Sequence, residues 1–320
     1  MNRITELVER TSRTFALGIR QLPGSLERSV SVAYLLLRVS DYFEDNARME
    51  PDEKVRYLAA WADTLRSVPD AEPRFAGPSD FDDSTPDAEA ARNADLILEA
   101  FRDLAAAERD IVGRHVVDST EGMARWVRTG PAFETEADLD DYMFEVAGRV
   151  GLLLTDLFAL RSEPVKHRHK EMSKLAVEFG LGLQTVNVIR GLSSDPARGW
   201  IFLPREFVPD DIHPASLWSA PGSPSALALL DRLVTKARRH LVAARNYVLC
   251  IPRREYGVRV FCLLPLLFAV RTVKHSRSNP TVYTSELKLT REEVRRITRR
   301  TRLFAASNTW IRATVGTQTA

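Results

Sequence analysis

Four charged side chains close together in the sequence could bind a metal ion and a phosphate group. They fall at spacings of three and four residues in LLLRVSDYFEDNAR: Arg38, Asp41, Glu44 and Asp45. On a helix this spacing puts all four on one side, and the apolar run just before them predicts that the helix is buried. Clustered carboxylates in a core need a compensating cation, and Mg²⁺ prefers oxygen ligands. The pattern therefore favours Asp41, Glu44 and Asp45 as Mg²⁺ ligands; the alternative is a solvated acidic face.

A second candidate for anion binding lies upstream, in the segment SRTF. Its Ser12 and Arg13 could donate hydrogen bonds to phosphate oxygens. The acidic pattern Asp-x-x-Glu-Asp is weak by itself, but the nearby Arg38 and this segment strengthen it. Together they indicate that a phosphate-bearing ligand is bound near the acidic helix.

The elements that must position these residues are predicted to be helices. Helical periodicity dominates, and no long alternating run bounded by hairpin turns is present, so the fold class is predicted to be all-α. Clusters of proline and glycine predict loops at residues 69–86, 204–224 and 279–280. Residues 1–320 are expected to form one domain with a mobile acidic loop at about residues 68–90, because the helices on both sides need each other's apolar faces.

The composition narrows the class of protein. Forty-five Lys and Arg against 43 Asp and Glu leave a net charge of +2, which provides no overall field for nucleic acid, so an anionic ligand needs a local site. Two cysteines, Cys250 and Cys262, are too few for a disulfide framework or a thiolate metal site. The amino terminus lacks the apolar core of a secretory signal. These features predict a cytoplasmic protein.

Two segments near the carboxyl end bear on membrane binding. Val258–Val270 is the most apolar stretch, but its thirteen residues fall short of the roughly twenty that span a bilayer. It is interpreted as a buried core helix, and no transmembrane anchor is predicted. A further helix is expected from about residue 290, where Thr290 and Glu293 form a capping box. Its arginines are interpreted as a solvated face, because aromatic interleaving is absent and the summed charge is small.

Four longer stretches carry a resemblance to a known family. They are TSRTFALGIRQLPGSLERSVSVAYLLLRVSDYFED, DYMFEVAGRVGLLLTDLF, FGLGLQTVNVIRGLSSDPARGWIFLP and YGVRVFCLLPLLFAV. Together they resemble the squalene and phytoene synthase family of isoprenoid synthases over most of the chain. The resemblance implies a single isoprenoid-synthase domain, in which a barrel of helices surrounds a deep apolar cavity with two acidic helices facing one another at its mouth. It also implies a monomer or a weak homodimer.

The resemblance also implies a chemistry and a set of site residues. In the family, two prenyl diphosphates condense head to head, Mg²⁺ ions draw off diphosphate, and the cavity shelters the carbocation from water. Asp41 is thereby implied in catalysis as well as in metal binding. Substrate or diphosphate contacts are implied for Ser12, Arg13, Phe15, Tyr34, Arg38, Gln184, Asn187 and Arg190. For Gln184, Asn187 and Arg190, three kinds of contact stay open: with metal-bound water, with diphosphate or with an acceptor.

Three departures from the family pattern lie where its chemistry occurs. The second acidic motif, normally Asp-x-x-Glu-Asp, reads Gly-Leu-Ser-Ser-Asp at residues 191–195, so the carboxylate pair that would bind Mg²⁺ is missing. Trp200 stands where the family tends to have a diphosphate-binding arginine. Glu145 stands where many squalene synthases have a catalytic tyrosine. The retained first motif and the altered second one favour a reaction with a single diphosphate.

These departures suggest an aromatic acceptor in place of the second diphosphate. Trp200 could stack on an aromatic ring, and Glu145 is the candidate base that removes the ring proton after attack by the allylic cation. An ion pair with Arg149 is the alternative role for Glu145. Asp195 could act instead as the base, a residual Mg²⁺ ligand or a hydrogen-bond acceptor. The pattern is similar to that of squalene-synthase-like enzymes that prenylate carbazoles in bacterial alkaloid pathways.

Three hypotheses follow from the residues and the resemblance. The first is a Mg²⁺-dependent prenyltransferase of secondary metabolism that moves a short allylic group, expected to be dimethylallyl, onto an aromatic molecule such as a carbazole. The second is a head-to-head synthase that condenses two farnesyl diphosphates and tolerates the altered motif. The third is a non-catalytic subunit. The intact first motif counts against the third, since a protein without activity has no need of that cluster.

Overall fold

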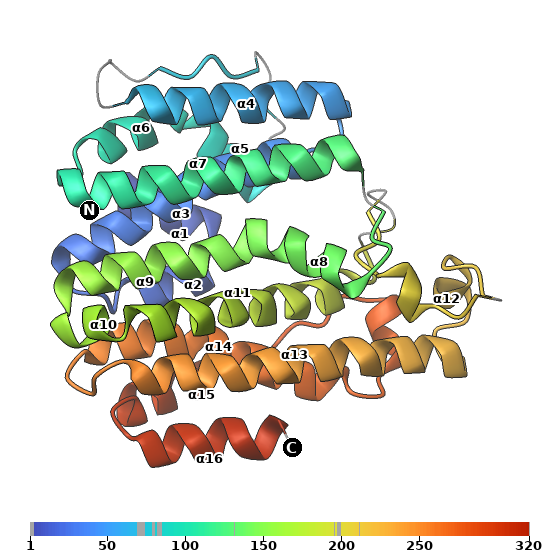
Figure 1. Cartoon of the computed structure of the whole chain (residues 1–320). Coiled ribbons are helices and arrows are strands. Elements are labelled where there is room, and N and C mark those ends of the chain that lie inside the picture. The colour runs from blue at the N-terminus through green and yellow to red at the C-terminus, as the bar shows by residue number, and fades with distance from the viewer. Residues whose placement is uncertain are drawn as a thin grey trace. The chain divides into compact units, whose positions relative to one another are not determined.

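The computed structural model describes residues 3–68, 74–78, 81, 85–130, 132–194, 196, 200–210 and 212–319, apart from the side chains of Arg13 and of residues 317–319. Within these ranges every regular element is a helix, so the all-α prediction is confirmed (Figure 1). Contacts divide the chain into two compact units. Unit 1 comprises Met1–Gly130 and Leu152–Lys166, and unit 2 comprises Pro131–Gly151 and His167–Ala320. The single-domain organisation stays a prediction.

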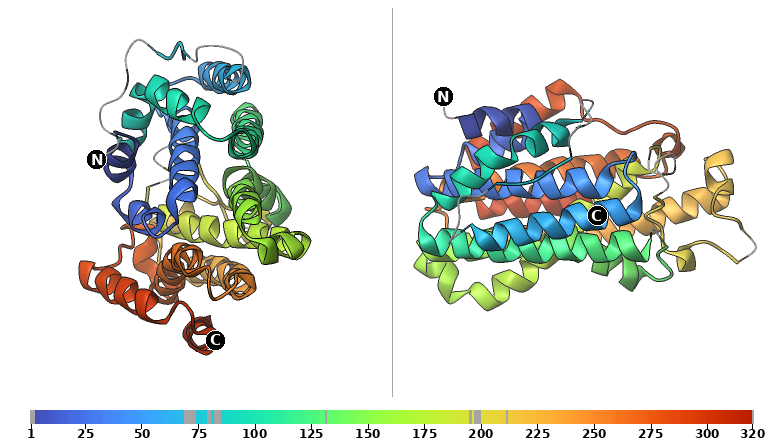
Figure 2. Two further views of the ribbon diagram at one scale, coloured as in Figure 1. Left: turned by 90° about the vertical axis from the view of Figure 1, so that its left-hand side faces the viewer. Right: turned by 90° about the horizontal axis from the view of Figure 1, so that it is seen from above.

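Unit 1 is built around one buried helix. Its helices are α1(Arg3–Thr11), α2(Arg13–Ile19), α3(Gly24–Asp45), α4(Pro51–Ser67), α5(Pro86–Arg92), α6(Ala94–Arg102) and α7(Ala106–Thr129), joined by most of α9(Arg149–Arg161) and α10(Glu163–His167). α3 packs against α1, α2, α4, α5, α6 and α7, and Figure 2 shows it in blue between α1 and α7. Leu35, Leu36 and Val39 of α3 have no exposed surface. The predicted burial of this helix is confirmed.

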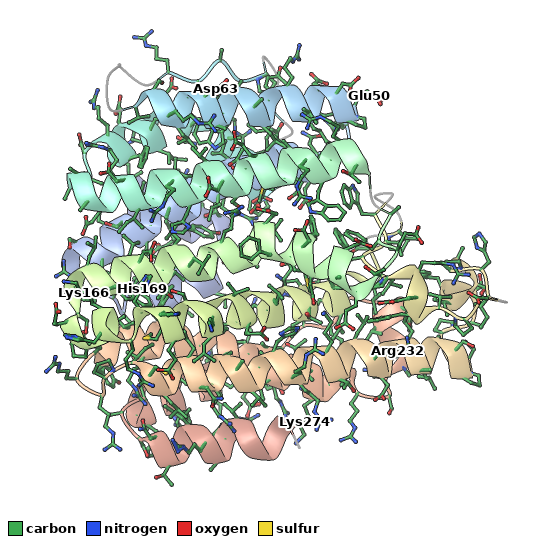
Figure 3. All side chains as sticks on the ribbon, in the orientation of Figure 1. Glu50, Asp63, Lys166, His169, Arg232 and Lys274 are labelled. Atoms are coloured by element: carbon green, nitrogen blue, oxygen red, sulfur yellow. The ribbon has the colours of Figure 1, made fainter. Side chains whose placement is uncertain are left out.

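Helix α4 shows how an apolar and a polar face are divided in unit 1. Glu50, which precedes α4, and Asp63 within α4 are both exposed (Figure 3). The opposite face of α4 carries Leu58 and Trp61, which are fully buried. This division between an apolar and a charged face is the 3.6-residue pattern of an amphipathic helix.

Unit 2 is organised around two long helices packed side by side, α11(His169–Gly191) and α13(Pro224–Cys250) (Figure 1). α11 also packs against α14(Tyr256–Ser276) and the π-helical turn η1(Phe144–Gly148). The other elements are α8(Glu136–Met143), η3(Arg205–Phe207), α12(Ser216–Ser219), η4(Pro280–Tyr283), α15(Arg291–Phe304) and α16(Asn308–Thr319). α11 therefore lies in the interior of unit 2.

Two glycines allow α11 to approach the η1–α9 segment at backbone distance. A Cβ atom added at Gly180 would lie 2.4 Å from the carbonyl oxygen of Ala147, and one added at Gly151 would lie 2.3 Å from that of Ala176. Real Cβ atoms are not found so close to backbone atoms, so no residue other than glycine fits at these positions without movement of the helices. The glycines in VAGRVG and FGLG thus have a packing role.

The apolar stretch near the carboxyl end is longer than the sequence predicts. α14 has 21 residues, from Tyr256 to Ser276, and continues through Pro265. In the described part of the chain it is the single helix whose length and composition would suffice to cross a membrane, and 72% of its apolar window is buried. The interpretation as a buried core helix is confirmed, although the predicted length is wrong.

Several other boundaries differ from the predictions. α5 begins at Pro86, so the loop expected at about residues 68–90 ends earlier, and residues 69–73, 79–80 and 82–84 of that loop lie outside the described residues. The predicted loop at residues 204–224 contains η3 and α12. The capping box of Thr290 and Glu293 is confirmed at the start of α15, but α16 was not anticipated.

Glu293 predicts a pH-dependent contribution to stability. Its carboxylate accepts hydrogen bonds from the Thr290 amide (3.0 Å), His275 (2.9 Å) and Arg271 (2.7 Å). These bonds, chiefly the one from the Thr290 backbone, lower the pKa of Glu293 to about 2. A carboxyl whose pKa is lower in the folded state stabilises the fold above its unfolded pKa and loses this effect as the pH falls toward the folded value.

We therefore expect Glu293→Gln to reduce the free energy of unfolding by roughly 2 kcal/mol at neutral pH. Glutamine keeps the capping geometry, so the change removes mainly the charge. The difference from the unmodified protein should shrink steadily between about pH 5 and pH 2 in thermal denaturation experiments. The exposed neighbour Glu292, changed to Gln, serves as the control and should show no such trend. A difference that is independent of pH would contradict the assignment.

Candidate functional site

The centre of the candidate site in unit 1 is Arg38, which lies between two carboxylates. Its Nη1 donates a hydrogen bond to Oδ2 of Asp41 at 2.9 Å, and its Nη2 forms an ion pair with Asp87. The side chains of Arg38, Asp41 and Asp87 are 28%, 26% and 17% exposed, respectively. Asp87 lies in the first turn of α5, which packs against α3. The sequence analysis did not find Asp87, because it belongs to no motif around residue 41.

The charges of this cluster depend on one another. Burial raises the pKa of Asp41 to about 7; the charge of Arg38 opposes this, and Asp87 and Asp45 add to it. Burial acts to lower the pKa of Arg38, but Asp41 and Asp87 outweigh it and raise that pKa above its usual value. Arg38 therefore keeps its positive charge at any pH at which the protein is folded. Unit 1 thus contains a permanent cation held by two acidic side chains at a partly exposed position.

The three predicted metal ligands differ in how far they are exposed. Glu44 is only 5% exposed, whereas Asp41 is partly exposed and Asp45 is exposed. The reason is helical geometry: positions 34, 38, 41 and 45 form one stripe of α3, and Glu44 belongs to the buried stripe that includes Leu37 and Ser40. Glu44 is thus more deeply buried than Asp41 and Asp45, and its role as a metal ligand stays a prediction.

The arrangement of these side chains does not by itself identify a metal site. Among the residues that the structure describes, no three His, Cys, Asp or Glu side chains are grouped as a metal site. Arg38 supplies the compensating cation that the sequence analysis assigned to Mg²⁺. The carboxylate oxygens of Asp41 and Asp45 have the chemistry that Mg²⁺ prefers, but Mg²⁺ binding stays a prediction.

The upstream segment also belongs to the unit 1 site. Ser12 caps α2, where its Oγ accepts a hydrogen bond from the Phe15 amide at 3.2 Å. The Phe15 ring stacks on the ring of Tyr34 with centroids 4.8 Å apart. Burial raises the pKa of Tyr34, whereas Arg38 and hydrogen bonds with Thr11 and Ser12 lower it. Ser12, Phe15, Tyr34 and Arg38 are therefore neighbours; the side chain of Arg13 lies outside the described residues.

In unit 2, Glu145 lies in the π-helical turn η1. Its side chain is buried, and its carboxylate forms an ion pair with Arg149, whose Nη2 lies 3.4 Å from Oε1. The Arg149 guanidinium also lies 4.9 Å from the centre of the Phe144 ring. The ion pair is the alternative that the i,i+4 spacing predicted. π-Helical turns are rare and are often found at functional sites, and the role of Glu145 as a base stays a prediction.

The predicted stripe on α11 has partners in unit 2. Asn187 Nδ2 donates a hydrogen bond to Oε1 of Gln184 at 3.1 Å. Arg190 pairs with Glu286, a residue that precedes α15 and that no sequence motif identified. Gln184, Asn187 and Arg190 thus follow one another toward the end of α11, as predicted. Asp195, the candidate base or ligand in the altered motif, lies outside the described residues.

Trp200 is part of an aromatic cluster in unit 2. Its ring stacks on Phe202 with centroids 5.5 Å apart, and the ring of Tyr142 lies 5.2 Å from Phe202 and 6.1 Å from Trp200. Trp200 and Phe202 also border a small hollow with Val188 of α11. The cluster offers ring surfaces suited to stacking, and it also packs residues 200–202 against the rest of unit 2.

Comparison with known proteins identifies the family. A sequence model of the Squalene/phytoene synthase family matches residues 8–296 of the chain. The chain belongs to the squalene/phytoene synthase family. Squalene synthase from Schizosaccharomyces pombe is 27% identical over 298 residues, which are 90% of this chain and 62% of the relative. Squalene synthase 1 from Arabidopsis thaliana is 26% identical over 311 residues, 93% of this chain and 70% of the relative.

Solved structures of family members have the same fold. A structure of TcSQS with the ligand BPH1237 matches with a TM-score of 0.80 at 25% identity, covering 99% of this chain and 90% of that one. A dehydrosqualene synthase matches with a TM-score of 0.62 at 17% identity, covering 95% of each chain, and this likeness concerns the fold alone. The predicted isoprenoid-synthase fold is confirmed. The chain spans 62% of the length of the S. pombe relative, or about three-fifths.

Membership in this family supports the predicted family and fold, but not the finer resemblance to carbazole-prenylating enzymes. The two relatives compared by sequence are squalene synthases, and none of the proteins named above is described as an aromatic prenyltransferase. The resemblance to carbazole-prenylating enzymes therefore rests on the departures at residues 191–195, Trp200 and Glu145 alone. At these positions the chain differs from the pattern of its family.

Proposed function

We propose that this chain is a prenyltransferase that ionises one allylic prenyl diphosphate with the unit 1 cluster. The observation that carries the proposal is the position of Arg38, a permanent cation held by Asp41 and Asp87 and one helical turn before the first acidic motif. A preorganised cation of this kind stabilises the negative charge that develops on a departing diphosphate. Ser12 and Tyr34 offer further hydrogen bonds to the same group.

The proposal includes a divalent metal ion, Mg²⁺, bound at the unit 1 cluster. Support comes from membership in the family and from the carboxylates of Asp41 and Asp45. The protein is further proposed to act in the cytoplasm as a monomer or weak homodimer and to need no nucleic-acid partner. The small net charge of +2 agrees with the absence of a nucleic-acid partner.

Comparisons favour a second prenyl diphosphate as the acceptor. The two relatives compared by sequence are squalene synthases, and a structure of TcSQS matches this chain. On this basis the reaction is head-to-head condensation of two farnesyl diphosphates. This candidate requires that residues 191–195, with one carboxylate in place of three, still bind the second diphosphate.

A specific observation favours an aromatic acceptor, such as a carbazole, in secondary metabolism. The second motif lacks the carboxylate pair, and Trp200 belongs to a cluster with Tyr142 and Phe202 that offers ring faces for stacking. The allylic cation would attack the ring carbon, and the ring proton would pass to a base. Glu145 is the candidate for this base, and its pairing with Arg149 holds the buried carboxylate in position.

One incubation separates these candidates. The purified protein is supplied with C5, C10, C15 or C20 prenyl diphosphates, with and without indoles, carbazoles and phenols, and products are read by mass spectrometry. A prenylated ring formed only with both substrates supports the aromatic acceptor. A hydrocarbon or cyclopropyl diphosphate formed from the prenyl diphosphate alone supports head-to-head condensation. Parallel reactions with EDTA test the metal requirement, and absence of any product with Mg²⁺ present would contradict the proposed function.

For Glu145→Gln we expect unchanged affinity for the prenyl diphosphate and product formation slowed by about 100-fold, the lower end of what general bases contribute. Binding is measured by calorimetry and turnover by product formation. Arg149→Gln is the matched variant, because it breaks the same ion pair and leaves the carboxylate in place. If the carboxylate serves only as the partner of Arg149, the two variants should lose stability and turnover in parallel.

A further inference from the structure

Helix α15 displays a row of arginines that have no protein partner. Five of them are exposed: Arg295, Arg296, Arg299, Arg300 and Arg302. Within the described ranges, none of these five guanidinium groups takes part in an ion pair or a hydrogen bond. The helix itself is firmly held, since Glu293 in its first turn binds Arg271 and His275 of α14. The arginines are thus presented to the surroundings by an anchored helix.

Helix α15 has a larger positive net charge than the whole chain. Its fourteen residues contain six arginines and two glutamates, which is a formal charge of +4, whereas the whole chain carries +2. Arg295 and Arg299, like Arg296 and Arg300, are four residues apart, so like charges face each other along the helix and destabilise it. An anionic partner would remove this repulsion.

Exposed apolar side chains gather at the end of the same helix. Leu303 is 68% exposed and Phe304 is 43% exposed, and Tyr256, which is 40% exposed, donates a hydrogen bond to the backbone of Arg302. Three of the four large apolar side chains that are exposed in the described residues therefore lie together. A purely solvated basic face does not need such a cluster. These residues supply the apolar element that the sequence analysis found missing.

We propose that α15 docks on an anionic lipid bilayer. The arginines would lie at the level of the headgroup phosphates, and Leu303, Phe304 and Tyr256 would enter the boundary with the acyl chains. Basic side chains next to exposed leucine and aromatic residues are typical of helices that lie on membrane surfaces. A nucleic acid would explain the arginines but not the exposed Leu303. The inference does not depend on the proposed catalytic function.

Vesicle flotation tests this inference with the full chain. Vesicles of phosphatidylcholine alone are compared with vesicles that contain equal parts of phosphatidylglycerol. We expect binding only to the anionic vesicles, and weaker binding as salt is added. Arg296→Glu/Arg300→Glu should reduce binding by at least about 25-fold, since each basic residue near an anionic surface contributes about fivefold.

Arg102→Glu/Arg128→Glu is the matched control. Both arginines are exposed in unit 1, so this variant has the same change in net charge. It should bind like the unmodified protein, and circular dichroism should show that both variants are folded. Equal losses in the two double variants would overturn the proposal, because binding would then follow net charge and not α15.

Leu303→Gln tests the apolar part. We expect it to bind anionic vesicles at low salt and to release them at lower salt than the unmodified protein does. Binding identical to that of the unmodified protein at every salt concentration would overturn the insertion of Leu303. A duplex or single-stranded oligonucleotide that binds through the same arginines, with no binding to anionic vesicles, would overturn the membrane proposal in favour of nucleic acid.

Discussion

Asp41→Asn should lower turnover with a prenyl diphosphate by about 100-fold or more, a loss typical of removing one preorganised charged group from such a site. Asparagine has nearly the shape of aspartate, but it cannot balance Arg38 or offer a carboxylate to a metal ion. Burial raises the pKa of Asp41 to about 7, so the charged form is costly at this position. The variant should therefore be as stable as the unmodified protein or more stable, particularly above pH 7.

Steady-state kinetics and thermal denaturation measured on the same samples check this expectation. Asp110→Asn provides the control, because Asp110 is exposed on α7 in the same unit. Its turnover and melting temperature should not change. Turnover of Asp41→Asn within threefold of the unmodified protein would remove Asp41 from the chemistry. A large fall in its melting temperature would mean that the Arg38 ion pair serves mainly the fold.

Gly180→Ala should reduce the free energy of unfolding by about 3 kcal/mol, at the upper end of the usual cost of overpacking. The added methyl group would lie 2.4 Å from the carbonyl oxygen of Ala147, which is backbone and cannot rotate away. α11 and η1 would have to separate. Because η1 carries Glu145, we also expect slower turnover from this variant, even at temperatures where it is fully folded.

Urea denaturation measures the stability of this variant, with Gly316→Ala as the matched control. Gly316 also lies within a helix, α16, but the nearest atom to an added Cβ is 3.8 Å away, in the side chain of Arg245. This control should be unchanged or more stable by about 0.5 to 1 kcal/mol, since alanine favours helix. If Gly180→Ala behaved like the control, the helices would not be in backbone contact at this point.

Local spacing was enough to predict part of the unit 1 site. Arg38 and Asp41 lie one helical turn apart on α3, so their pairing follows from the 3.6-residue period. The same spacing did not predict that Glu44, also one turn from Asp41, is buried beside Leu37 while Asp41 stays partly exposed. Distinguishing the two stripes requires knowledge of which helices cover α3.

Partners that are distant in sequence could not be predicted in the same way. Asp87 reaches Arg38 from α5, and Glu286 reaches Arg190 from the segment before α15. Neither lies in a motif, and only the packing of segments distant in the sequence brings these pairs together. The π-helical turn at Glu145 was equally hidden, since its residues FEVAG have no pattern that distinguishes this turn from an ordinary α-helix.

For protein engineering, the backbone contact between α11 and the η1–α9 segment separates two kinds of position. Gly151 and Gly180 are closed to any larger side chain, so libraries that vary them would consist mostly of misfolded proteins. Asn187 is exposed on α11, and Trp200 is half-buried in a segment without helical structure. Substrate range should therefore be explored at Asn187 and Trp200 while both glycines are kept.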